Sequence, residues 1–247
     1  MKEASFLEHL EELRRRILCS IVAVVIGSGL SFRYSHRLLE ILYFPLKGKV
    51  ENLILLKPQE GLLVYLKVSI FSGIVLASPF ILYHFWAFLS PGLFHRERKA
   101  IFPLVAFSPV LFLTGVLFAY KVVIPVGLDF LLRFTGPHLL PTFSLNYYIS
   151  FVTRFLIGLG VLFQVPLIVA VLTRMDILRY RDLLKFHRYA ILGAFVVSAL
   201  LTPPDIVTQL LLGLPLILLF EFSVLISWII SRSVKIEKKG GEDGKDK

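Results

Sequence analysis

Residues 189–230 read YAILGAFVVSALLTPPDIVTQLLLGLPLILLFEFSVLISWII, two apolar runs separated by a short polar stop. The stop is Thr202-Pro203-Pro204-Asp205, and its prolines lack amide donors and disfavour helix in the residue before them. Apolar runs on both sides of such a stop indicate helices inside a membrane, where the backbone must satisfy its own hydrogen bonds. The pattern predicts a tight transmembrane hairpin. Its apolar arms, 189–201 and 206–220, are shorter than the about 20 residues of an ordinary span.

The composition of the whole chain agrees with an all-α integral membrane protein. Mean hydropathy is +0.78 and only 18% of the residues are charged, against about one quarter in soluble domains. The apolar runs predict six transmembrane helices in a single domain, residues 1–233, and a charged, glycine-rich, disordered tail at 234–247. The predicted helices cover roughly 17–32, 62–89, 100–125, 147–172, 189–201 and 206–230.

The N-terminal residues predict an amphipathic helix that lies on the membrane surface and leads into the first span. Ser5 and Glu8 have the spacing of a capping box, and apolar residues recur behind them at helical spacing. The run Arg14-Arg15-Arg16 before an apolar stretch is also typical of a secretory signal peptide. No small-residue cleavage site follows it, so we expect a retained helix.

Most basic residues lie at one set of segment ends: near the N-terminus, at 96–99, at 174–188 and in the tail. The positive-inside rule therefore predicts a multi-pass protein of the cytoplasmic (inner) membrane with both termini in the cytoplasm. This distribution also accounts for the net charge of +10 without nucleic acid as a partner. The sequence has one cysteine, Cys19, scattered histidines, and no nucleophile–base, metal-ligand or phosphate-loop motif. We therefore expect no enzymatic activity and no bound metal or cofactor.

Two acids at the predicted cytoplasmic edge are candidate acceptors for a cation. Glu97 lies in the basic run His95-Arg96-Glu97-Arg98-Lys99, and Glu12 lies in the N-terminal helix. A carboxylate can bind a guanidinium through two charge-assisted hydrogen bonds. Alternatively, Glu97 is a solvated loop acid, and Glu12 pairs with Arg16, as Glu11 does with Arg15, at i, i+4 spacing.

Gln164 and Glu221 are the polar residues set deepest in the apolar runs. Ionisable groups inside a membrane are costly and often functional. For Glu221 the alternative is an acid that faces the bundle, protonated or paired. For Gln164, in the segment Phe163-Gln164-Val165-Pro166, the alternative is a proline kink with a local hydrogen bond.

The ordered set of motifs resembles the TatC family, the multispanning C subunit of the twin-arginine protein translocase. The resemblance covers nearly the whole chain. It rests on His9-Leu10-Glu11-Glu12-Leu13-Arg14, Trp86-Ala87-Phe88, Pro91-Gly92-Leu93 running into Glu97-Arg98, Phe163-Gln164-Val165-Pro166 and Leu201-Thr202-Pro203-Pro204-Asp205.

The resemblance implies a concave, glove-like bundle that recognises the twin-arginine signal peptides of folded precursors for export driven by the proton gradient. It implies signal-peptide contacts at Glu97, Glu12, Arg14 and Phe88. It also implies single-span A- and B-type partner subunits that dock near the outer hairpin, at Thr202, Pro203, Pro204, Asp205 and Gln209, and a homo-oligomer within the complex.

The sequence departs from the family at one position and leaves one rival function open. The family often carries a glutamate on the membrane-embedded concave face where this chain has Gln164, so a role that needs a negative charge is not expected there, and a hydrogen-bonding role stays open. The rival is a secondary transporter of a small solute or ion that uses Glu221 and Gln164. The lack of an internal repeat argues against it.

Overall fold

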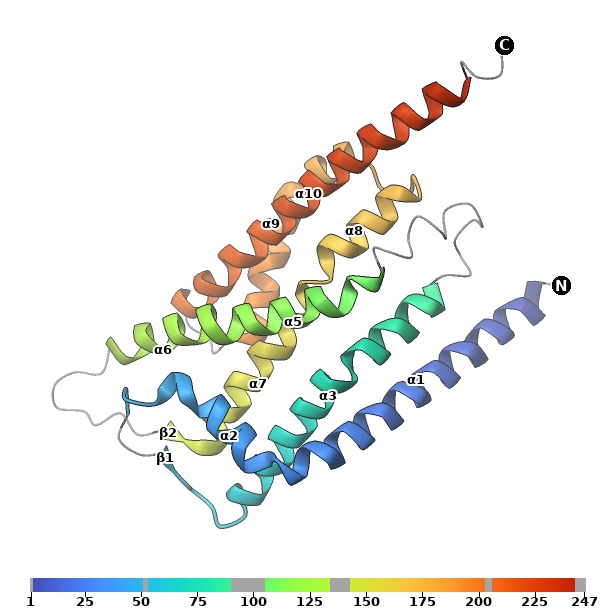
Figure 1. Ribbon diagram of the computed structural model, residues 1–247. Helices are drawn as coiled ribbons and strands as arrows, with labels where there is room; N and C mark the ends of the chain where they lie inside the picture. Colours follow the sequence, from blue (N-terminus) through green and yellow to red (C-terminus); the bar gives the residue numbers. More distant parts are fainter. Residues whose placement is uncertain (1, 51–52, 90–104, 134–142, 203–205, 243–247) are drawn as a thin grey trace. The chain divides into compact units, whose positions relative to one another are not determined.

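The computed structural model describes residues 2–50, 53–89, 105–133, 143–202 and 206–242, and almost all of this backbone is helical (Figure 1). Within the described residues, six helical spans are long and apolar enough to cross a membrane. The predicted number is therefore confirmed. The spans are Leu7–Arg33, Glu60–Phe88, Ser108–Arg133, Leu145–Arg174, Tyr180–Leu201 and Ile206–Arg232.

The chain divides into two compact units, and the predicted single domain stays a prediction. The described parts of Met1–Gly92 and Pro109–Gly160 form the first, and those of Leu93–Ser108 and Val161–Lys247 form the second. The first unit holds α1 (Lys2–Arg33), α2 (Ser35–Tyr43), η1 (Phe44–Leu46), β1 (Leu53–Ile54), α3 (Glu60–Leu89), most of α5 (Ser108–Phe118), the π-helical turn η3 (Ala119–Val123), α6 (Ile124–Arg133), β2 (Phe143–Ser144) and most of α7 (Leu145–Leu162). The second holds α8 (Val165–Arg174), α9 (Tyr180–Leu201) and α10 (Ile206–Glu242).

Several helix boundaries differ from those predicted. Helix α1 is continuous from Lys2, so the N-cap expected at Ser5 is wrong, whereas the N-terminal helix does lead into the first span as predicted. Helix α9 begins at Tyr180, and α10 continues to Glu242 through residues expected to be disordered. The reason is that hydropathy marks only the lipid-facing part of a helix. Lys, Arg and Glu have good helix propensity and prolong the helix beyond the apolar run.

The third and fourth spans depart from regular helix at defined sites. The third begins its described helix at Ser108 and Pro109, and proline favours a helix's first turn. It then passes through η3 into α6 and ends at Arg133, later than the predicted 125. The fourth span breaks between α7 and α8, ahead of Pro166, whose ring cannot continue the backbone ladder.

Helices α1 and α3 run side by side and pack closely through glycine (Figure 1). A Cβ on Gly27 would lie 3.0 Å from the carbonyl oxygen of Gly73. A Cβ on Gly73 would lie 2.5 Å from the backbone nitrogen of Ser28 and 2.8 Å from its Cα. Small residues let two backbones touch within a membrane, where apolar burial alone gives helices little reason to associate. This crossing aligns the two helices.

A buried carboxylate ties the two strands to the start of α3. Glu60 is only 5% exposed. One of its carboxylate oxygens accepts hydrogen bonds from the hydroxyl of Ser144 and from the amide of Asn146, the latter at 3.1 Å. The amides of Leu56 and Lys57 donate to its other oxygen at 2.5 and 3.3 Å. One acid thus joins residues around β1 and β2, which pair in parallel at Leu53 with Phe143.

Replacing Glu60 with alanine is expected to lower the midpoint of thermal unfolding in detergent by about 5–10 °C, because the amide and hydroxyl donors lose their acceptor. Glu40→Ala is the matched control, since Glu40 lies on α2 of the same unit with a 69% exposed side chain. Equal shifts for the two variants would show that the Glu60 contacts contribute nothing specific. Circular dichroism of the purified protein measures both.

The second unit packs α10 against α8 and α9. Val169, Leu183 and Val224 form a small buried apolar cluster contributed by the three helices. The buried hydroxyl of Thr173 donates to that of Ser227 at 2.9 Å, which links α8 to α10. Apolar contact and polar pairs such as this one therefore fix these helices within the unit.

Candidate functional site

Glu12 is held by a guanidinium of its own helix. Arg16 donates to its Oε1 from Nε at 3.0 Å and from a terminal nitrogen at 2.5 Å. Nδ1 of His9 lies 3.8 Å from the other carboxylate oxygen. The i, i+4 alternative is thus confirmed for Glu12 and Arg16, whereas Glu11 and Arg15 make no ion pair in the described structure. Oε2 keeps capacity for a further donor.

His9 connects the Glu12 end of α1 to the end of α3. Its ring stacks on Phe88, with centroids 4.3 Å apart and planes inclined by 16°. Both aromatic side chains are thereby placed next to the Glu12–Arg16 pair. The structure therefore brings together two of the predicted signal-peptide residues, Glu12 and Phe88, through a histidine between them.

An apolar groove of about 390 Å³ extends from this cluster between α1 and α3. Arg16 and Phe88 lie at its charged end, and its walls include Ile17, Ile81 and Phe85. Nδ1 of His84, also in the groove, is buried with no hydrogen-bond partner in the described structure. In the first unit, the Glu12–Arg16 pair thus lies at one end of an apolar groove.

Two other residues, Arg14 and Glu97, were predicted at the cytoplasmic edge. Arg14 is exposed on α1. Glu97 lies outside the described residues, so its predicted role stays a prediction.

Gln164 lies at the break between α7 and α8 with both ends of its amide occupied. Its Oε1 accepts from the Ser108 hydroxyl at 2.6 Å, and its Nε2 donates to the Ser108 carbonyl at 3.0 Å. The side chain is only 7% exposed. The kink predicted at Pro166 is present, but the amide bonds a residue far away in sequence instead of the local backbone. Ser108, in the same unit, thus provides hydrogen-bond partners for both the oxygen and the nitrogen of the Gln164 amide.

Glu221 of α10 pairs with His187 of α9. Its Oε1 lies 2.8 Å from Nδ1 of the histidine, an ion-pair distance whose angles are not those of a hydrogen bond. Both side chains are 44% exposed. The paired-acid alternative therefore describes this site. Glu221 and Gln164 both belong to the second unit and make no described contact with one another.

Two residues of the predicted docking hairpin stabilise the second unit. The hydroxyl of Thr202 donates to the carbonyl of Ser198 at 2.8 Å and ends α9. Nε2 of Gln209 donates to the carbonyl of Phe195 at 3.0 Å, which joins α10 to α9. Pro203, Pro204 and Asp205 lie outside the described residues.

Comparison with known proteins identifies the family. The family model described as "Sec-independent protein translocase protein (TatC)" matches residues 8–215 of this chain. The chain belongs to the TatC family. It is 41% identical to TatC of Aquifex aeolicus, over 92% of this chain and 96% of that one, and 38% identical to TatC of Carboxydothermus hydrogenoformans, over 98% of both. A crystal structure of the twin arginine translocase receptor TatC is 40% identical, with a TM-score of 0.82 over 90% of this chain and 99% of that one.

Membership of the TatC family establishes the general role. The chain is a multi-pass membrane protein and a core subunit of the Tat translocase, and so part of a system with partner subunits. The same finding favours protein translocation over the small-solute transporter that the sequence left open.

Sequence reasoning missed four residues that partner the candidate residues or fix the strands. His9, Glu60, Ser108 and His187 each partner a residue from another helix or strand. For two of them, Glu60 and Ser108, the sequence does contain a signal. Glu60 is an acid at the very start of an apolar run, and Ser108 is a hydroxyl inside one. Such buried polar groups need partners, although sequence does not say which.

Proposed function

We propose that this TatC-family chain is the receptor for the twin-arginine signal peptides of folded precursors, with Glu97 and Glu12 as the acceptors. The observation that carries the proposal is the Glu12 carboxylate, which already binds a guanidinium through two hydrogen bonds. An incoming arginine has the same fork and can displace Arg16 or use the second oxygen. Arg14 and Phe88 assist at the same edge.

The apolar stretch of the signal peptide lies along the membrane-embedded helices. The α1–α3 groove supports this placement, since it runs from the Arg16 and Phe88 end between two apolar helices. Gln164 and Glu221 are polar positions of the membrane-embedded face that contribute hydrogen bonds as the precursor passes. Their present partners, Ser108 and His187, hold them until then.

Single-span A- and B-type subunits dock at α9 and the adjoining hairpin, residues 202–205 with Gln209. Only 11% of the most apolar window of α9 is buried within this chain, and Leu192 and Leu200 are widely exposed. A partner helix can cover this surface in the complex, where several copies of the chain assemble. The protein lies in the cytoplasmic membrane with both termini in the cytoplasm, as the positions of Lys and Arg favour.

A twin-lysine signal peptide is expected to bind the purified full chain about 10-fold more weakly than the twin-arginine peptide, because lysine lacks the planar fork. Fluorescence anisotropy of labelled peptides in detergent measures both affinities. Equal affinities would contradict recognition through two hydrogen bonds. Glu12→Gln should narrow the difference, whereas Glu8→Gln, an exposed acid one turn earlier on α1, should leave it unchanged.

A further inference from the structure

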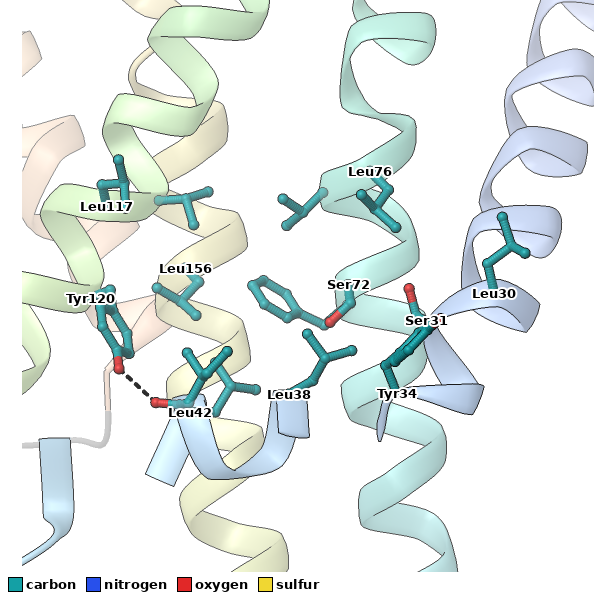
Figure 2. A pocket seen from close by; sticks show the side chains of 14 residues that line it. Leu30, Ser31, Tyr34, Leu38, Leu42, Ser72, Leu76, Leu117, Tyr120 and Leu156 are labelled. Atoms are coloured by element: carbon teal, nitrogen blue, oxygen red, sulfur yellow. Dashed lines mark hydrogen bonds between the residues drawn. The ribbon is translucent and has the colours of Figure 1, made fainter. Parts of the chain in front are cut away.

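The first unit contains a second apolar cavity, which shares no lining residue with the α1–α3 groove. Its volume is about 540 Å³, within the range of about 300–1,000 Å³ usual for small-molecule sites. Leu30, Leu76, Leu117 and Leu156 contribute to its walls from α1, α3, α5 and α7, and Leu38 and Leu42 of α2 lie at one end (Figure 2). The cavity is therefore built for an apolar guest.

One polar atom in the wall has no partner. The hydroxyl oxygen of Ser31 is buried and makes no hydrogen bond in the described structure, and the residue is only 3% exposed. Figure 2 shows it at the last turn of α1, near Tyr34. A buried hydroxyl without a partner calls for an explanation. An ester carbonyl of a bound guest would accept its hydrogen.

A more polar cavity of about 700 Å³ adjoins the first and shares Ile41 and Tyr120 with it. The Tyr120 hydroxyl donates to the carbonyl of Ile41 at 2.6 Å, at the junction of the two (Figure 2). Arg37 and Lys47 line the second cavity. Its single acid is Glu40, whose carboxylate is 3.6 Å from Nδ1 of His36. The mouth is thus net cationic.

We propose that the two joined cavities bind one anionic phospholipid. An acyl chain occupies the apolar cavity, the ester region reaches Ser31, and the phosphate lies between Arg37 and Lys47. The inference concerns a lipid ligand and does not depend on the proposed receptor function.

The position of α2 favours a lipid over a protein segment. This helix follows directly on the membrane span that ends at Arg33, so its residues lie at the depth of lipid headgroups. Basic side chains at this depth attract anionic headgroups, and long side chains reach them while their stems stay in apolar surroundings. An apolar cavity beside a cationic mouth matches the order of groups along one phospholipid molecule.

Native mass spectrometry of the detergent-purified full chain tests the proposal, with phosphatidylglycerol or phosphatidylcholine added at increasing concentration. We expect phosphatidylglycerol to bind about 10-fold more tightly than phosphatidylcholine. The double variant Arg37→Gln/Lys47→Gln should abolish this preference. The matched control is Lys57→Gln/Arg133→Gln, which removes two exposed charges of the same unit that line neither cavity and should keep the preference.

The apolar part is tested separately by Leu117→Trp, which fills the cavity and should lower retention of both lipids. Val75→Phe is a second filling variant in case the first fails to fold, as judged by circular dichroism. An unchanged preference in the Arg37/Lys47 variant, unchanged retention in a folded filling variant, or retention of detergent or of a second chain in place of lipid would each overturn the proposal.

Discussion

Replacing Glu97 with alanine is expected to abolish photocross-linking between this chain and a twin-arginine precursor. If Glu97 is the main acceptor, its loss removes two charge-assisted hydrogen bonds. It also leaves the incoming guanidinium beside Arg96 and Arg98, whose like charge then repels it. The loss should therefore exceed that of Glu12→Gln, because the carboxylate of Glu12 shares its binding with Arg16.

The measurement uses a precursor that carries a photoreactive residue next to its arginine pair, with the chain in native membranes. Glu97→Asp keeps the charge on a shorter side chain and should retain part of the cross-link. Glu8→Ala, which removes an exposed acid of α1, is the matched control and should retain all of it. Full cross-linking to the alanine variant would remove Glu97 from the site.

The number of spans could be predicted from the sequence because a membrane imposes one requirement on every apolar run. A run near 20 residues must be a helix to satisfy its backbone. The break at Pro166 was predictable for a similar reason, since a missing amide has a local effect. The extensions of α9 to Tyr180 and of α10 to Glu242 were not, because charged helix formers give no hydropathy signal.

In the candidate site, the contact within one helix was predictable from the sequence, but the contacts between distant segments were not. Spacing alone offered the Glu12–Arg16 pair, since both residues share one helix face. The stacking of His9 on Phe88 and the pairing of Gln164 with Ser108 join residues that are distant in sequence. Nothing local specifies such contacts. They depend on how helices are aligned, and the alignment of α1 with α3 depends on glycines.

Gly73→Ala is accordingly expected to destabilise the first unit by about 1–3 kcal/mol, and Gly73→Leu by more. The added Cβ would overlap the Ser28 hydroxyl and lie 2.5 Å from the backbone nitrogen of that residue. A flexible side chain can move aside, but a helix backbone cannot without shifting α1. Thermal unfolding in detergent measures the loss. Gly29→Ala is the matched control on α1, because a Cβ there would meet nothing within 4 Å.

A second substitution separates the two sources of the clash. Ser28→Gly removes the hydroxyl but leaves the backbone nitrogen and Cα that a Gly73 Cβ would also meet. It should therefore rescue Gly73→Ala only in part, and complete rescue would show that the backbones do not touch. A shifted α1 also moves His9 away from Phe88 and Glu12 away from α3. Twin-arginine peptide affinity should consequently fall in Gly73→Leu and stay unchanged in Gly29→Leu if the proposed recognition site depends on the glycine crossing.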